Sequence, residues 1–234
     1  IDFEKLLFEE NENIGKTEFT QPAILLVSSI ANAIFKEKCN ITPEFVLGHS
    51  LGEFSALVAA GAIDYLDAIE LVHKRGLFMT EACAGGGAGM MALVGIDDAT
   101  VEKVCTEQRE LGKRVWPANY NMDGQLVLAG IKADLESLVD VFKAAGAKRA
   151  IVLDMSVASH CELLQSAVEN LKPFLEEFLK DEFMPVISNV STNAYTTKNE
   201  AVELLSSQLT SPVKYKQSIK ACEDKVDLFI EFGN

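Results

Sequence analysis

The 234-residue sequence is poor in the residue types that mark several classes of protein. It has five cysteines, an odd number, and no two of them are spaced C-x-x-C. This pattern argues against a disulfide scaffold and against a zinc site, and it favours a reducing, cytoplasmic compartment. No uninterrupted apolar run approaches the roughly 20 residues that span a bilayer. The N-terminus, IDFEKLLFEENENIGK, also lacks the basic start and apolar centre of a signal peptide.

Positive charge is scarce as well. Lysine and arginine number 21 against 35 aspartates and glutamates, which gives a formal net charge of -14. Nothing across the molecule would offset phosphate repulsion, so we expect no nucleic-acid partner. Three basic pairs remain candidates for a local patch, namely Lys113-Arg114, Lys148-Arg149 and Lys214/Lys216. The length fits one large domain or two small ones, with a sizeable core.

The segment Phe45 to Gly61, FVLGHSLGEFSALVAAG, contains the motif G-x-S-x-G around Ser50. An apolar run precedes the motif and a helical pattern follows it, as in a nucleophile elbow, where a strained serine joins a strand to a helix. Positions 48 and 52 must hold small residues, here Gly48 and Gly52, because larger side chains there would collide across the turn. The N–H of Leu51, at the start of the helix, is then a candidate oxyanion donor. The alternative is a tightly packed glycine-rich turn without catalytic function.

The pattern around this motif predicts further helices and strands. A helix is expected over residues 20–36 with Thr20 as N-cap, a short buried strand over residues 45–47, and a helix over residues 51–60 that Gly61 ends. Another helix starts at Asp64 or Asp67 and runs towards Cys83. The glycines at positions 85–87 and 89 then indicate a hinge or domain boundary. No Gly-Lys-Ser/Thr follows them, which excludes a P-loop.

The periodicity of apolar residues changes after these glycines. Residues 90–96, 115–121, 125–131 and 150–157 have strand patterns, and residues 97–110 and 132–147 have helical ones. The order β-α-β-β-α-β is that of a ferredoxin-like unit. We therefore predict an α/β protein with a ferredoxin-like subdomain over residues 88–155, inserted into a larger α/β domain formed by residues 1–87 and 156–234. Buried strands are also expected at residues 185–190 and 228–232.

A serine nucleophile needs a base, and the chain has only three histidines. His49 lies inside the elbow and His73 on a helix. His160 follows the strand at residues 150–157, and Ser159 with Glu162 forms a capping-box pattern that would place it at the first position of a helix. A helix N-terminus disfavours the imidazolium, so His160 is the candidate base. The alternative is a surface histidine at a capped helix start, with no catalytic role. Asp154 or a backbone carbonyl could orient the ring.

Arg75 lies on an apolar helix face. Its neighbours three and four positions away are Leu71, Val72, Phe78 and Met79. A guanidinium on such a face is costly to bury unless an anion meets it. The anion is either a carboxylate elsewhere in the fold or a substrate carboxylate, which arginine binds with two parallel hydrogen bonds.

Several separate segments, in order, resemble malonyl-CoA:acyl carrier protein transacylases of bacterial fatty acid synthesis. They are GHSLGEFSALVAAG, VHKRGLFMTEA, NYNMDGQLVLAG, GAKRAIVLDMSVASHCELL and LTSPVKY. The resemblance implies an α/β-hydrolase-like large domain and a ping-pong transfer of malonyl through Ser50, with His160 as base and Arg75 as the clamp for the malonyl carboxylate. It implies main-chain carbonyls as the group that orients the histidine. It also implies malonyl-CoA and acyl carrier protein as partners, with the coenzyme A thioester as substrate and no cofactor or metal.

The resemblance also leads us to expect a cytoplasmic monomer. The family begins with a strand and a loop that supplies a second oxyanion donor, and it continues past EFGN, so we expect this chain to be a piece of a longer protein. Two other functions compete with the malonyl transfer. One is a serine hydrolase such as an esterase or thioesterase, and the other is a non-catalytic module that binds acyl carrier protein.

Overall fold

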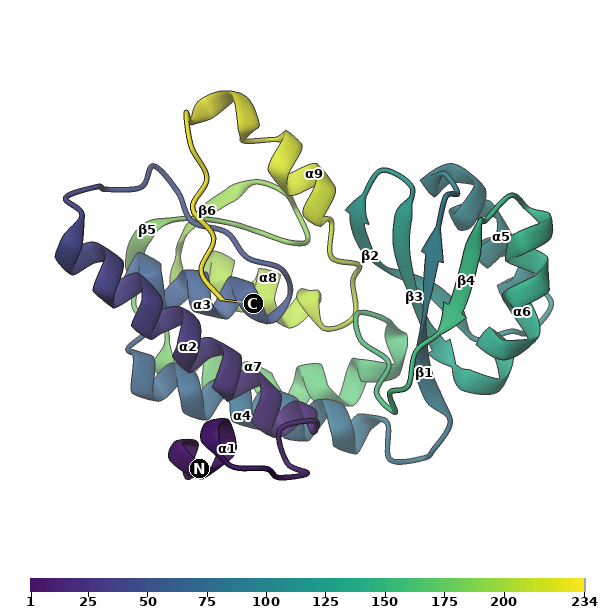
Figure 1. Ribbon diagram of the computed structural model, residues 1–234, viewed down its shortest axis with the longest axis horizontal. Helices are drawn as coiled ribbons and strands as arrows, with labels where there is room; N and C mark the ends of the chain where they lie inside the picture. The colour runs from purple at the N-terminus through teal and green to yellow at the C-terminus, as the bar shows by residue number, and fades with distance from the viewer. Residues whose placement is uncertain (234) are drawn as a thin grey trace.

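A four-stranded antiparallel sheet with two helices on its outer face forms the smaller of two lobes (Figure 1). The computed structural model describes residues 1–233. The small lobe contains β1 (Ala88–Val94), α5 (Asp98–Glu110), β2 (Val115–Met122), β3 (Gln125–Ile131), α6 (Lys132–Ala144) and β4 (Arg149–Val152). The strand order β2-β3-β1-β4 is that of the predicted ferredoxin-like unit.

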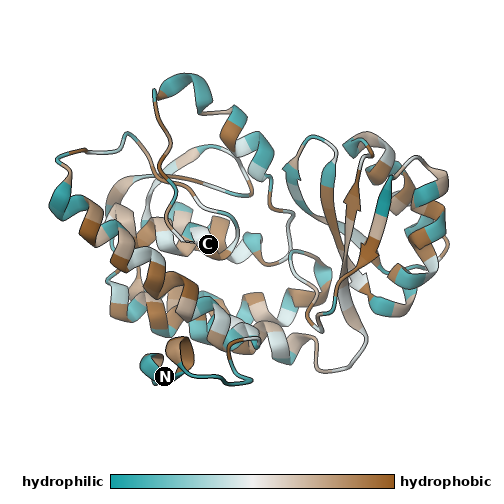
Figure 2. Ribbon diagram, in the orientation of Figure 1, coloured by the Kyte–Doolittle hydropathy of each residue, from teal (hydrophilic) through white to brown (hydrophobic). Residues whose placement is uncertain are grey.

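Successive side chains of the strands point to opposite faces of the small sheet, and apolar residues are buried on both faces. Met91 and Leu93 of β1 pack with Leu126 of β3 against α5 and α6, whereas Met90 and Ala129 belong to a second cluster that faces the rest of the molecule. Figure 2 shows the resulting hydrophobic character of these strands. Because both faces are covered, the sheet is held between its own helices and the large lobe.

The large lobe is built from the segments on either side of the small one. Its helices are α1 (Phe3–Phe8), α2 (Thr17–Lys38), α3 (Leu51–Ala60), α4 (Tyr65–Ala82), α7 (Gln165–Phe178), α8 (Lys198–Gln208) and α9 (Tyr215–Lys220), with 3₁₀ turns at Glu162–Leu164 and Glu223–Lys225. Strands β5 (Glu182–Ile187) and β6 (Ala194–Thr197) pair antiparallel, and Val46 forms a parallel bridge to Val186. One apolar core of fully buried residues such as Leu57, Leu71 and Leu175 joins these elements. The predicted α/β fold class is confirmed.

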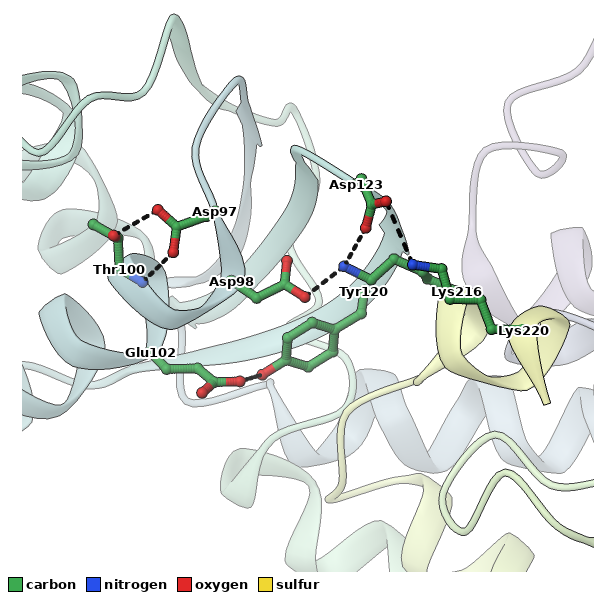
Figure 3. A network of polar contacts seen from close by, with 8 residues as sticks. All are labelled: Asp97, Asp98, Thr100, Glu102, Tyr120, Asp123, Lys216 and Lys220. Carbon is green, nitrogen blue, oxygen red and sulfur yellow. Dashed lines mark hydrogen bonds and ion pairs between the residues drawn. The ribbon is translucent and has the colours of Figure 1, made fainter.

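A backbone bridge and a group of ion pairs are among the contacts that connect the lobes. Val213 forms a parallel bridge with Asn119, in which the Tyr120 N–H donates to the Val213 carbonyl over 2.9 Å. Beside it, Lys216 of α9 forms ion pairs with Asp98 at 2.5 Å and with Asp123 at 3.0 Å (Figure 3). The Lys216 side chain is only 13% exposed, and its charge is paired with these two aspartates within the protein.

Helices α2 and α4 approach each other closely at Gly76. A Cβ at this position would lie 2.4 Å from the Cα of Glu18, so only glycine fits. By length and composition α2 could cross a membrane, but here it packs against α3 and α4, with Gln21, Ala23 and Leu25 buried. Of its most apolar 18-residue window, 28% is buried, and Ile30 and Ile34 on the other face are exposed.

Several local expectations were wrong. Helix α2 begins at Thr17 rather than after Thr20, and Pro22 lies inside it. The hydroxyl of Thr20 instead donates to the carbonyl of Lys16, at 3.0 Å. Residues 228–232 form no strand among the described residues, although residues 185–187 do lie in β5. The domain boundaries at residues 87/88 and 155/156 stay a prediction.

The close approach at Gly76 gives a test of the packing. We expect Gly76→Ala to lower the free energy of unfolding by about 1–3 kcal/mol, because the added methyl group forces the two helices apart. Urea denaturation would measure the change. Gly15→Ala is the matched control, since a Cβ there meets no atom within 4 Å. Equal stability of the two variants would contradict this account.

Candidate active site

Ser50 occupies a strained turn between the Val46 bridge and helix α3. Its φ of 53° and ψ of -104° are unusual for a residue with a side chain. A Cβ on Gly48 would lie 2.1 Å from the carbonyl carbon of Gly52, so the chain can turn this sharply only with glycine at position 48. The turn has the geometry expected of a nucleophile elbow. Leu51 is the first residue of α3, so its N–H has no carbonyl one turn earlier in the helix to bond.

The two glycines of the motif are not equivalent. A Cβ on Gly52 would meet no atom within 4 Å, because it points away from the turn. The expectation that both glycines prevent a collision was therefore wrong for Gly52. The collision involves the side chain of residue 48 and the backbone of residue 52.

His160 lies against the serine. Its Nε2 is 2.7 Å from the Ser50 Oγ, and its Nδ1 is 2.7 Å from the carbonyl oxygen of Gln208. A carbonyl can only accept, so Nδ1 carries the proton and Nε2 presents its lone pair to the serine hydroxyl. The ring is thus in the tautomer that a general base requires. A backbone carbonyl orients it, and Asp154 is exposed to solvent.

The reason for the neutral imidazole differs from the one expected. His160 is not the first residue of a helix: it has a left-handed φ of 61°, and the 3₁₀ turn begins two residues later with no side-chain cap. Burial, followed by the charge of Arg75, lowers the pKa of His160 to about 3. The ring therefore stays uncharged at neutral pH.

Arg75 is buried beside the same hydroxyl. Its guanidinium donates to Gln21 Oε1 at 2.6 Å, to Gln208 Oε1 at 3.0 Å and to the Ser50 Oγ at 3.2 Å. Burial lowers the pKa of Arg75 to about 10, against the opposing charge of Glu53. Its Nε is buried and has no hydrogen-bond partner in residues 1–233. The guanidinium thus keeps one unpaired N–H within the described residues.

The sequence did not point to the residues that support these three. Gln208 contacts Ser50, Arg75 and His160, while Asn189 accepts from the Ser50 N–H at 2.7 Å and donates to the Gly48 carbonyl at 2.7 Å. One signal was available: Glu53 is the single charged residue of an otherwise apolar helix, LGEFSALVAA. A lone charge on an apolar helix face is the same kind of anomaly that singled out Arg75. In the structure Glu53 is 1% exposed and lies beneath the elbow.

The other two histidines lie apart from this chemistry. His49 is exposed, with its Nε2 2.9 Å from Asn121 Oδ1 and its ring edge-on to Tyr215. His73 bonds the carbonyl of Glu18 through Nδ1 at 2.6 Å. In the described part of the chain, no group of three histidine, cysteine or acidic residues could hold a metal ion.

The fold and this constellation define an acyltransferase. The profile of the acyl transferase domain family matches residues 3–233, and the chain belongs to that family. Within it, the chain is a member of the malonyl CoA-acyl carrier protein transacylases, which are enzymes. It is 44% identical over 231 residues to the transacylase of Bacillus subtilis, covering 97% of this chain and 73% of the relative. The Escherichia coli K12 relative is 41% identical over 89% of this chain and 68% of its own length.

Solved structures agree with this assignment. The transacylase of Helicobacter pylori superimposes with a TM-score of 0.95 at 45% identity, covering all of this chain and 75% of that one. A malonyl-transacylase in complex with its type II polyketide synthase acyl-carrier protein gives a TM-score of 0.91 at 37% identity, covering 96% of this chain and 73% of that one. The resemblance found in the sequence is confirmed.

The two glycines of the motif give a matched test of the elbow. We expect Gly48→Ala to reduce acyl transfer at least tenfold, because the methyl group forces Ser50 away from His160. Gly52→Ala should keep activity within about threefold, since its methyl group meets open space and alanine favours a helix. Steady-state rates with circular dichroism as a check on folding would measure both. Equal losses would contradict the asymmetry.

Proposed function

We propose that this protein moves malonyl from coenzyme A to the phosphopantetheine thiol of acyl carrier protein in fatty acid biosynthesis. The observation that carries the proposal is the meeting of three groups: Ser50 Oγ lies 2.7 Å from the His160 Nε2 and 3.2 Å from an Arg75 nitrogen. A nucleophile, its base and a buried cation therefore share one position. The names of the relatives specify malonyl and the carrier.

In the first half-reaction, His160 Nε2 takes the proton of the Ser50 hydroxyl as Oγ attacks the thioester carbon. The N–H of Leu51 donates to the oxyanion of the tetrahedral intermediate. The carbon–sulfur bond then breaks, and His160 returns the proton to the departing thiolate of coenzyme A. The Gln208 carbonyl supports the imidazolium that exists between these two transfers.

The second half-reaction reverses these steps with a new thiol. His160 takes the proton of the carrier's phosphopantetheine thiol, whose sulfur attacks the malonyl-serine ester. The carbon–oxygen bond breaks, and Ser50 recovers its proton from His160. Throughout, the malonyl carboxylate is held by the Arg75 guanidinium. The coenzyme A thioester enters as substrate, and this cycle uses no cofactor or metal. We further propose that the protein acts as a cytoplasmic monomer.

A covalent adduct tests the proposal directly. Incubation with malonyl-CoA should add one malonyl group to the protein, detectable by intact mass, and the adduct should disappear when acyl carrier protein is added. Ser50→Ala should carry no adduct. A protein that binds acyl carrier protein but takes no malonyl group would be the non-catalytic module instead.

Arg75 separates a malonyl transferase from a general serine hydrolase. We expect Arg75→Ala to lower kcat/KM for malonyl-CoA by about 100-fold, the loss of a charged, buried hydrogen bond. Use of acetyl-CoA should be spared or raised, because that acyl group has no carboxylate to hold. Parallel assays with the two thioesters would measure the ratio. If both activities fall together, Arg75 is structural and the hydrolase becomes the better assignment.

A further inference from the structure

Glu53 is a buried acid that the proposed reaction does not use. It is the third residue of α3, its carboxylate lies beneath the elbow, and it is 1% exposed. Its Oε2 accepts from the Asn189 N–H at 3.1 Å and from Gln208 Nε2 at 2.8 Å, and its Oε1 accepts from the Tyr195 hydroxyl at 2.9 Å. The three donors favour the ionised carboxylate, whereas its burial disfavours it.

Two of these donors belong to residues that hold the reacting groups. The Asn189 side chain bonds the backbone on both sides of the elbow, at Ser50 N and Gly48 O. Gln208 bonds the Ser50 carbonyl through Nε2, Arg75 through Oε1, and His160 through its backbone carbonyl. Glu53 therefore lies one contact away from the nucleophile, the base and the cation.

The charge of Glu53 favours one orientation of the Gln208 amide. A carboxylate only accepts hydrogen bonds, so the amide must turn its NH₂ group to Glu53 and its oxygen to Arg75. The Ser50 carbonyl and the Arg75 guanidinium favour the same orientation, so a neutral side chain at position 53 would weaken the hold on the amide without removing it. No acidic side chain in the described structure forms a salt bridge with Arg75, and the Gln208 amide links its charge to that of Glu53.

We propose that Glu53 is a positioning residue whose negative charge strengthens the hold of Gln208 and Asn189 on the reactive arrangement of Ser50, Arg75 and His160. The inference rests on the proposed function, since the arrangement is the one that would transfer malonyl. Glu53 touches neither the substrate nor the reacting atoms in this account. It acts through Gln208 and Asn189.

The titration of Glu53 gives the proposal a pH signature. Burial, opposed by its three donors and by Arg75, raises the pKa of Glu53 to about 7. The other ionisable groups around it are Arg75 on α4, Tyr195 on β6 and, beyond Gln208, His160. His49, next to Ser50 in the elbow, also acts on His160 through its charge. Arg75 and Tyr195 keep their charge states between pH 5 and 8, and His160, with a pKa of about 3, stays neutral. A free malonyl carboxylate also stays ionised over this range.

The experiment compares the rate of Ser50 malonylation from pH 5 to 8.5 in three proteins. The wild-type rate should fall as the pH drops through about 7. Glu53→Gln keeps the shape and can donate to the Tyr195 hydroxyl, so its rate should be about tenfold lower at pH 8 and flat with pH, meeting the wild-type rate near pH 5. Tyr195→Phe removes one donor to the carboxylate and so raises the pKa of Glu53. The fall in its malonylation rate should therefore occur at higher pH, with the same maximal rate as the wild type.

Stability separates positioning from a structural role. The folded pKa of Glu53 lies above its ordinary value of 4.5, so its contribution to stability is greatest below pH 4.5 and is lost as the pH rises through 7. At pH 8, Glu53→Gln removes a buried charge and should melt no earlier than the wild type while reacting more slowly. Earlier melting together with lower activity would make Glu53 structural and overturn the proposal.

The remaining outcomes are also decisive. A wild-type rate at pH 8 in Glu53→Gln overturns the proposal, as does a wild-type rate that stays constant from pH 8 to 5. Should Glu53→Gln fail to fold, the wild-type and Tyr195→Phe profiles still decide. A wild-type protein that takes no malonyl group on Ser50 refutes the proposed function itself, which is a different result from an active enzyme that is indifferent to residue 53.

Discussion

The contact between the backbones of residues 48 and 52 is the constraint on which the site depends. A side chain at position 48 would overlap the carbonyl carbon of Gly52, so the chain can fold back here only around a glycine. Folding back forces Ser50 into a strained backbone conformation that lifts its hydroxyl clear of α3. The strain costs about 1–3 kcal/mol, and the two Asn189 hydrogen bonds to the turn offset part of it.

Burial of the ring and one buried cation together determine the protonation of the base. Burial lowers the pKa of His160 most, and Arg75 lies close enough to oppose a second positive charge. The base is therefore neutral because of its surroundings, while the Gln208 carbonyl chooses its tautomer. An arginine held mainly by amide oxygens, with no acidic side chain forming a salt bridge to it in residues 1–233, keeps its attraction for an incoming carboxylate.

The sequence predicted what depends on near neighbours and missed what depends on distant ones. The elbow, the β-α-β-β-α-β order and the anomaly of Arg75 are local patterns, and they predicted the fold class and two of the three groups that meet at the site. Gln208 lies 158 positions from Ser50, and a glutamine near the end of a helix has no local signature. The capping pattern at Ser159 failed because tertiary contacts hold His160 in a left-handed conformation that a helix start does not allow.

The two lobes contribute differently to the site. Ser50, Arg75 and His160, with the residues that orient them, all come from the large lobe or from the segment that returns to it after β4 (Figure 1). In residues 1–233, the one hydrogen bond from the small lobe to the elbow joins Asn121 of β2 to the exposed ring of His49. Lys216 and Lys220 of α9 bind Asp123, two residues further along, in the turn that follows β2 (Figure 3). The ion pairs of α9 therefore tie the small lobe to the large one beside this contact. A change at this junction should leave the reacting groups in place, because none of their hydrogen bonds crosses it.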